Sequence, residues 1–170
     1  CYVKAARRLC REDPVFKERI SYFIGLVCGH LKSTFFADCF AWQSGIKAGQ
    51  LETIDFRVKA PGRLAYDYDI MLKSEDKEIV TRARSCFGQN WGWNSFRYSA
   101  CDYCDDVFAE TADVTVSDAW LPDYFDDDKG NSVVVVRNPT IKSLIESGLY
   151  EQRLALETLS PETMAKSQEG

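Results

Sequence analysis

Residues 101–120, CDYCDDVFAETADVTVSDAW, place two cysteines and three aspartates shortly before a strand pattern. Val114 and Val116 alternate with polar residues, which predicts a half-buried β-strand over 113–120. Cys101 and Cys104 stand two residues apart, a spacing used by metal sites, by redox disulfides and also by thiols that only fill space. The remaining sequence is needed to distinguish these three uses.

Length and composition predict a single domain. The chain has 170 residues, of which 45% are hydrophobic, and this suffices for one core. The first residue is Cys1 and a helical pattern from Ser160 ends early, so we interpret residues 1–170 as a fragment trimmed at both ends. No apolar stretch reaches the roughly 20 residues of a membrane span, and no signal peptide is visible.

The net charge and the cysteine content limit which binding partners and which cellular compartment are expected. The net charge of −5 repels a phosphate backbone, so nucleic acid is not an expected partner. The seven cysteines are odd in number and cannot all pair within the chain. Without a secretory signal they favour free thiols or metal ligands in a reducing cytoplasm, not a disulfide scaffold.

The pattern along the chain alternates helices and strands. It predicts helices over 2–12, 34–44, within 75–87, over 140–148 with Gly148 after the last turn, and from Ser160; and strands over 20–27, 53–59, 65–73, 113–120, 132–138 and 153–159. The strands 53–59 and 65–73 form a predicted hairpin, and the β-branched run 132–138 is predicted to be buried on both faces. The expected fold class is α/β (α+β mixed), a mixed β-sheet with flanking helices.

The cysteines outside the CxxC pair divide into two groups. Cys10 and Cys39 lie within helical apolar patterns and are predicted to be core residues, whereas Cys86 stays undecided. Cys28 ends the apolar run YFIGLVC, which predicts a thiol at the end of a sheet. Cys1 opens a helix, where the positive end of the helix dipole favours the thiolate.

Two kinds of metal site compete with metal-free thiols for the CxxC pair. A redox pair is disfavoured, because neighbouring aspartates raise a thiol pKa. The two metal alternatives are a Cys3His zinc site and a four-thiolate site suited to an iron–sulfur cluster. The first would use Cys28, His30, Cys101 and Cys104, and the second Cys1, Cys28, Cys101 and Cys104. Spacing alone does not decide between these and structural thiols.

Several motifs in order resemble one family. GLVCGHLKS at 25–33, the CDYC segment with ADVTVSDAW, and KGNSVVVVRN at 129–138 resemble the C-terminal region of the coenzyme F420 hydrogenase/dehydrogenase beta-subunit family. That family reads GLFC, then CxxCxD, then ADIxxGDxW, then GxS before an apolar strand and Arg. Residues 1–28 are similar to its segment that starts GTPCQ, which places Cys1 at that cysteine. Two departures are Ser117, where the family has glycine, and the segment 30–33, where it has a proline-containing motif.

The resemblance implies an electron-transfer oxidoreductase module. It would pass electrons between the clusters of a redox partner protein or subunit and a flavin or a deazaflavin such as coenzyme F420. Carried over by position, Cys1, Cys28, Cys101 and Cys104 would bind a [4Fe–4S] cluster. FAD contacts in the family come largely from residues that precede the position of Cys1.

Cofactor contacts within this chain are less sharply indicated. Lys32, Lys59 and Arg63 follow predicted strands, where cations suit phosphate or carboxylate groups. Asp118, with Trp120, would line the cofactor pocket. The competing interpretation makes the cations solvated surface charges and Asp118 a turn cap. The alternative function is a non-catalytic binding or scaffold domain of the same fold with structural zinc or no metal.

Overall fold

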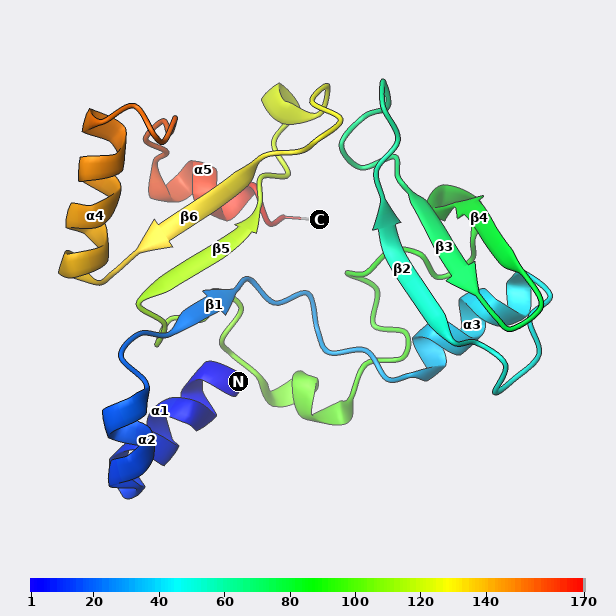
Figure 1. Cartoon of the computed structure of the whole chain (residues 1–170), viewed down its shortest axis with the longest axis horizontal. Helices are drawn as coiled ribbons and strands as arrows, with labels where there is room; N and C mark the ends of the chain where they lie inside the picture. The colour runs from blue at the N-terminus through cyan, green and yellow to red at the C-terminus, as the bar shows by residue number, and fades with distance from the viewer. Residues whose placement is uncertain (170) are drawn as a thin grey trace. The chain divides into compact units, whose positions relative to one another are not determined.

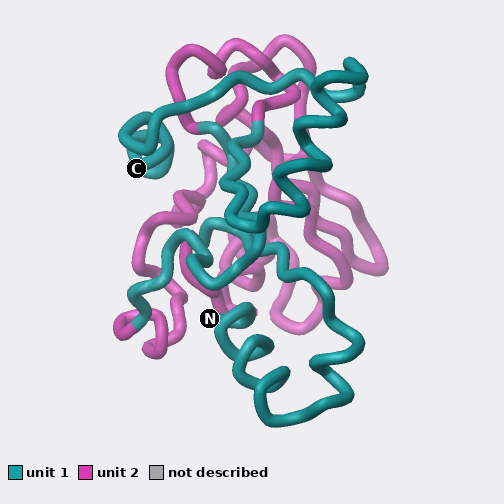
Figure 2. Tube along the Cα trace, turned by 90° about the vertical axis from the view of Figure 1, so that its left-hand side faces the viewer, with its two compact units in different colours: residues 1–28, 104–119, 132–169 teal, residues 29–103, 120–131, 170 magenta. Residues whose placement is uncertain are grey.

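The computed structural model describes residues 1–169, and the chain divides into two compact units (Figure 2). Unit 1 comprises residues 1–28, 104–119 and 132–169, and unit 2 comprises residues 29–103 and 120–131. Both units are therefore built from segments that are distant in the sequence. Each unit has its own three-stranded sheet.

The sheet of unit 1 is mixed and contains β1 (Ile24–Leu26), β5 (Val114–Asp118) and β6 (Ser132–Val136), with β5 in the centre (Figure 1). β1 runs parallel to β5, and β6 runs antiparallel to it. The expected α/β class with a mixed sheet is thus confirmed. β1 is much shorter than the predicted strand over 20–27.

One face of this sheet is closely packed. Gly25 in β1 lies against Ala109 and Ala112, and Thr115 of β5, the residue paired with Gly25, is fully buried. The prediction that the 132–138 strand is buried on both faces is wrong, because Val133 is buried whereas Val134 is 37% exposed. β6 lies at the edge of the sheet, so its β-branched run reflects strand propensity and not double coverage.

Four helices complete unit 1, and their first residues follow local rules. They are α1 (Tyr2–Glu12), α2 (Pro14–Arg19), α4 (Pro139–Tyr150) and α5 (Pro161–Lys166). Side chains of Asp13, Asn138 and Ser160 accept backbone hydrogen bonds as N-caps of α2, α4 and α5, each followed by a proline at the first helical position.

Two predictions for the C-terminal part of unit 1 are wrong. α4 continues past Gly148 to Tyr150, because Gly148 is used for close packing and not for a cap. A Cβ at Gly148 would lie 2.8 Å from Leu154 Cδ1, and the Gly148 carbonyl accepts hydrogen bonds from Arg153 N and Leu154 N. Residues 153–159 form no strand, since their alternating apolar residues have no partner strand to pair with.

Unit 2 contains an antiparallel sheet of β2 (Thr53–Val58), β3 (Asp69–Lys73) and β4 (Glu78–Arg82). The predicted hairpin is confirmed as β2 and β3. Of the helix predicted within 75–87, only the short 3₁₀ helix Ala83–Ser85 is present, and most of the stretch forms β4. Pairing of β4 with β3 places Ile79 opposite Leu72 and leaves Val80 exposed, so a tertiary partner overrides the local pattern.

The core of unit 2 forms between this sheet and α3 (Phe35–Gln43). Phe36 and Phe40 of α3 pack with Ile70 and Leu72 of β3, and all four are at most 3% exposed. Cys86, undecided from the sequence, is buried in this core. Cys10 and Cys39, predicted as core residues, are only half-buried.

Among the helices of residues 1–169, none combines the length and the apolar character that a membrane crossing requires.

Candidate functional site

The segment after Cys104 forms a tight turn in unit 1. Asp106 is almost completely buried, and its Oδ1 accepts a hydrogen bond of 2.7 Å from Glu110 N. Its Oδ2 has no hydrogen-bond partner among residues 1–169, and the nearest cation, Lys4 Nζ, lies 3.8 Å away. The acidic residues behind the CxxC pair therefore include a turn-forming carboxylate, and not only solvated charge.

Helix α1 is fastened to this turn by its first basic residue. Lys4 Nζ donates a hydrogen bond of 2.9 Å to Asp105 Oδ1. This bond raises the pKa of Lys4, and the same bond lowers the pKa of Asp105. Cys1 precedes Lys4 by one helical turn, on the same side of α1, so the contact ties the end of the helix that carries Cys1 to the segment that carries Cys104.

Strand β1 reaches the same turn through its backbone. Val27 N donates to Val116 O at 3.0 Å, which extends the pairing with β5, and Cys28 N donates to Val107 O at 2.9 Å. The chain leaves the sheet at Cys28, whose side chain is exposed. As predicted, this thiol lies at the end of a strand.

One half-buried carboxylate joins four parts of unit 1. Asp113 accepts hydrogen bonds from Arg7 Nη2 at 2.9 Å, Phe23 N at 2.8 Å and Asn138 Nδ2 at 3.0 Å. Burial raises the pKa of Asp113, but the bonds from Phe23 N, Asn138 and Arg7 together outweigh it and hold the pKa below its ordinary value. α1, the start of β1, the start of β5 and the cap of α4 are thus fixed to one another.

Arg137 holds the loop between the CxxC pair and β5 in place. Arg137, which follows β6, donates to Thr115 Oγ1 at 2.8 Å and to the carbonyl oxygens of Ala112 and Phe108. Thr115 in turn donates to Phe108 O at 2.8 Å. These bonds hold the loop from Phe108 to Ala112 against the sheet.

The four predicted cluster ligands are free thiols, and the structure places three of them on this scaffold. Cys1, Cys28 and Cys104 are exposed in unit 1, whereas Cys101 is half-buried in unit 2, in the 3₁₀ turn Ser99–Tyr103. Among residues 1–169, no three Cys, His, Asp or Glu side chains form a group that could hold a metal ion. The donor set fits an iron–sulfur cluster in its chemistry, because it offers unpaired thiols, but the side chains are not gathered around one point.

His30, the ligand of the competing zinc site, lies in unit 2 just after Cys28. Its φ of 73° is left-handed, and its Nδ1 is buried without a hydrogen-bond partner among the described residues. Its carbonyl accepts a bond from Trp91 Nε1 at 3.2 Å. Within the described part of the chain, His30 joins no metal-binding group either.

Lys32 is committed to its own chain. Its Nζ donates to Trp93 O and, at 3.0 Å, to Ser95 O, and it lies 5.7 Å from the centre of the Phe36 ring. Burial lowers the pKa of Lys32, and the charge of Arg97 lowers it further. In this arrangement Lys32 holds the 93–97 segment in place, and its role in cofactor binding stays a prediction.

Lys59 and Arg63 lie together in the connection between β2 and β3. Lys59 Nζ donates to Ala65 O at 2.8 Å, and Arg63 Nη1 forms an ion pair of 2.6 Å with Asp69. Both cations therefore stabilise their own loop. An anionic cofactor at this loop would have to share or replace these partners.

Asp118 ends β5 in unit 1, where it pairs with Ser132 of β6 and its carbonyl accepts a bond from Gln168 Nε2 at 2.9 Å. Trp120 belongs to unit 2, and there the Arg57 guanidinium lies 5.4 Å from its ring centre and 5.3 Å from that of Tyr68. No local pattern indicates this aromatic contact, since Arg57, Tyr68 and Trp120 are far apart along the chain.

The residues that organise the thiol region were also not predicted. Lys4 and Arg7 read as surface charges of an amphipathic helix, and Asp113 as part of a strand pattern. Lys4 meets Asp105 and Arg7 meets Asp113, each partner about a hundred residues away. The one available signal was the density of acidic residues around 102–113, which calls for cations from elsewhere in the chain.

Comparison with known proteins identifies relatives of the chain. Residues 1–162 match the family described as the C terminus of the beta subunit of coenzyme F420 hydrogenase/dehydrogenase. The fold is similar to a chain of the F420-reducing [NiFe] hydrogenase complex from Methanosarcina barkeri, studied by xenon derivatization, with a TM-score of 0.50 and 13% sequence identity. The match covers 99% of this chain and 57% of that chain, and at this identity it concerns the fold alone. No curated protein matches the sequence.

Proposed function

This chain belongs to the C-terminal family of coenzyme F420 hydrogenase/dehydrogenase beta subunits, and from that premise we propose that it is an electron-transfer module of an oxidoreductase. It would relay electrons between a redox partner protein or subunit and a flavin or deazaflavin. Because the chain spans 57% of the structural neighbour, the flavin and its substrate are part of this proposal.

The observation that carries the proposal is the convergence of three backbone segments on one turn. α1, β1 and the segment after the CxxC pair are joined by Lys4–Asp105 and by the Cys28–Val107 hydrogen bond. Each segment contributes one cysteine at an exposed position. A scaffold that only filled space would bury these thiols, as Cys86 is buried in unit 2.

The proposed ligands are Cys1, Cys28, Cys101 and Cys104, holding a [4Fe–4S] cluster. When bound, such a cluster supplies one-electron transfer, and FAD or coenzyme F420 supplies the two-electron hydride chemistry. The residues of this chain hold the thiols and balance their charge: Lys4, whose raised pKa keeps it protonated, lies near Cys104 and offsets part of the thiolate charge. Asp105 keeps Lys4 in that position.

Cofactor contacts from Lys32, Lys59, Arg63 and Asp118 stay predictions. The placement of Lys59 and Arg63 on one loop supports them as a pair that could meet an anionic group of FAD or coenzyme F420. Lys32 and Asp118 lack such support, because neither lies on the loop that carries Lys59 and Arg63.

The test is the iron and acid-labile sulfide content per chain, with a visible spectrum, on protein prepared without oxygen. We expect about four irons and four sulfides with a broad absorption band near 400 nm. Cys101→Ala should lose most of the iron, whereas Cys39→Ala, which changes packing in α3 and removes a weak hydrogen bond from Gln43, should keep it. The Cys39 variant is the matched control because it removes one thiol outside the proposed ligand set.

Two results would contradict this function. Unchanged iron in Cys101→Ala would remove this residue from the ligand set. About one zinc per chain and no iron would favour the alternative, a binding or scaffold domain with a structural zinc site formed by thiols and His30.

A further inference from the structure

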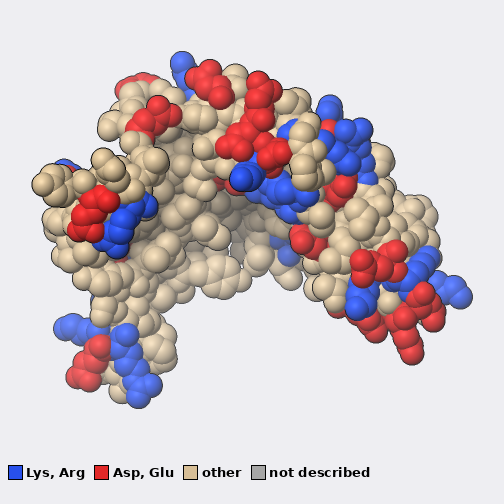
Figure 3. All heavy atoms as spheres, turned by 45° about the horizontal axis from the view of Figure 1, so that its top comes forward, with Lys and Arg blue, Asp and Glu red and all other residues tan. Residues whose placement is uncertain are grey.

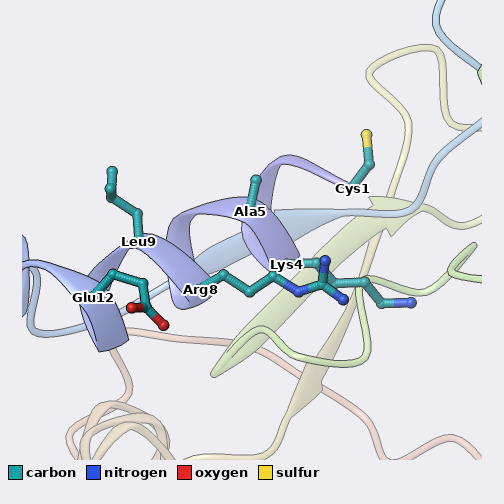
Figure 4. Close-up of a pocket in the computed structure, with 6 residues that line it drawn as sticks. All are labelled: Cys1, Lys4, Ala5, Arg8, Leu9 and Glu12. Carbon is teal, nitrogen blue, oxygen red and sulfur yellow. The ribbon is translucent and has the colours of Figure 1, made fainter.

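One face of α1 is largely exposed in unit 1, although Lys4 at its edge is bonded to Asp105. None of the helix residues is fully buried. A surface pocket of about 530 Å³ runs along this face, lined by Cys1, Lys4, Ala5, Arg8, Leu9 and Glu12. Figure 4 shows Cys1, Ala5 and Leu9 in a row along the helix, with Lys4, Arg8 and Glu12 extending beside that row.

This face has an apolar row next to a basic edge. At 100° per residue, Cys1, Ala5 and Leu9 share one stripe, and Tyr2 extends it; Leu9 is 42% exposed and Tyr2 is 72% exposed. Arg8 and Arg11 follow on the other side of the stripe. The inner side of the helix carries Arg7, which is bonded to Asp113, whereas the apolar row is exposed to solvent.

The charge of this region is opposite in sign to the net charge of the chain. Residues 1–19 contain six Lys and Arg against three Asp and Glu, so they carry +3 although the whole chain carries −5. Figure 3 shows Lys and Arg side chains gathered on the α1–α2 hairpin, at the lower left. A local charge opposite in sign to the net charge is a feature of docking surfaces that steer a charged partner.

Four of these six cations, Arg8, Arg11, Lys17 and Arg19, have no salt bridge within the described part of the chain. Lys4 is bound to Asp105 and Arg7 to Asp113, so both serve the fold of unit 1. Arg8 and Arg11 are exposed and form no salt bridge among residues 1–169. Because Arg8 and Arg11 lie on α1 itself, they are the charges that this face offers to a second molecule.

We propose that the face formed by Cys1, Ala5, Arg8, Leu9 and Arg11 docks an acidic surface of a redox partner protein that has apolar side chains at its centre. The proposal rests on the proposed function, because Cys1 is a proposed cluster ligand and the docking site would lie beside it. Complementary charge selects the partner, and contacts with the apolar row fix where the partner sits on the helix.

A protein surface fits this face better than a phosphate polymer or a membrane. The apolar row of Cys1, Ala5 and Leu9 offers no hydrogen bond or charge to phosphate groups. The helix has eleven residues and a small exposed apolar area, which gives little insertion into lipid. A small, charged and partly apolar patch matches the transient interfaces of electron-transfer partners.

The experiment measures binding of a labelled acidic peptide to the full chain by fluorescence anisotropy. The probe is an amphipathic peptide of about five helical turns with one leucine row flanked by glutamates. The double variant Arg8→Glu with Arg11→Glu should bind about tenfold more weakly at low salt. The matched control, Lys47→Glu with Lys129→Glu, reverses two charges of unit 2 and should bind as the unchanged chain does.

A gain-of-affinity variant guards against an effect of misfolding. Glu12→Gln removes the one carboxylate of the pocket and should tighten binding of the acidic peptide. A peptide with glutamines in place of the glutamates should bind weakly to all variants, and salt should weaken the acidic peptide because it screens exposed charges.

Equal peptide binding by the unchanged chain and the Arg8/Arg11 variant would overturn the proposal. So would stronger binding to phosphatidylserine vesicles or to polyuridine RNA than to the peptide, since these would identify a lipid or nucleic-acid surface. Iron content measured on the same samples separates this proposal from the proposed function. A chain without iron that still binds the peptide through Arg8 and Arg11 keeps the docking face and loses the cluster.

Discussion

At the scale of single residues, unit 1 depends on carboxylates with several partners. Asp113 alone receives hydrogen bonds from Arg7, from the backbone of Phe23 and from Asn138. Its side chain is only 13% exposed, so little water can replace a lost donor, and removing any of these hydrogen bonds costs stability. The segments that carry Cys1 and Cys28 are therefore positioned by a residue that touches neither thiol.

We expect Asp113→Asn to lower the free energy of unfolding by about 2–3 kcal/mol, since it replaces a carboxylate in charge-assisted hydrogen bonds by a neutral amide. Urea unfolding measures the change. Asp76→Asn, in the exposed turn between β3 and β4, is the control and should change stability little. An Asp113 variant as stable as the unchanged chain would show that these hydrogen bonds carry no net free energy.

The same residue gives a pH dependence with a defined sign. The folded pKa of Asp113 lies below its unfolded value of about 4, so the contribution to stability is complete above that value. It is lost as the pH falls through the folded pKa. Unfolding free energies measured at decreasing acidic pH should fall less steeply in Asp113→Asn than in the unchanged chain, and equal slopes would contradict the assignment.

At the scale of elements, β1 can pair with β5 only because its central residue has no side chain. A Cβ at Gly25 would lie 2.4 Å from Ala109 Cβ and 3.1 Å from Ala112 Cβ. Gly25→Ala should therefore push β1 away from the loop before β5 and cost about 1–3 kcal/mol by overpacking. Urea unfolding measures this, and the iron assay should show a lower iron content because Cys28 moves with β1.

Gly92→Ala is the matched control for β1. Its added Cβ would meet only the side-chain oxygen of Asn90, at 3.2 Å, in an exposed loop of unit 2. We expect a small change in stability and unchanged iron. Equal stability of the Gly25 and Gly92 variants would mean that the 109–112 loop can move away from the added methyl group at little cost in free energy.

At the scale of the whole molecule, each unit has its own sheet and its own packing. Leu72 is fully buried in the core of unit 2, so Leu72→Ala should cost about 2–5 kcal/mol. Hydrogen exchange should then accelerate for the amides of β2, β3 and β4 more than for those of β5. Val80→Ala, at a 56% exposed position of β4, is the control. Equal acceleration in both sheets would show that the two units unfold as one.

The sequence by itself determined the elements whose signals are local. The amphipathic pattern predicted α1, and Ser160 followed by proline predicted α5, because caps and helix periodicity act within a few residues. It also singled out four cysteines as proposed ligands, because the order of the motifs that contain them resembles the family. The hairpin of β2 and β3 followed from alternation and a short turn.

Only the tertiary structure decided the features that depend on distant partners. Residues 78–82 became a strand because β3 offers an edge, and α4 passes through Gly148 because Leu154 packs there. The contacts that tie the thiol-bearing segments together, Lys4–Asp105 and Arg7–Asp113, join residues separated by 101 and 106 positions. Such pairs leave no trace in a local pattern, because a charge has the same sequence signature whether it meets water or a partner from the far end of the chain.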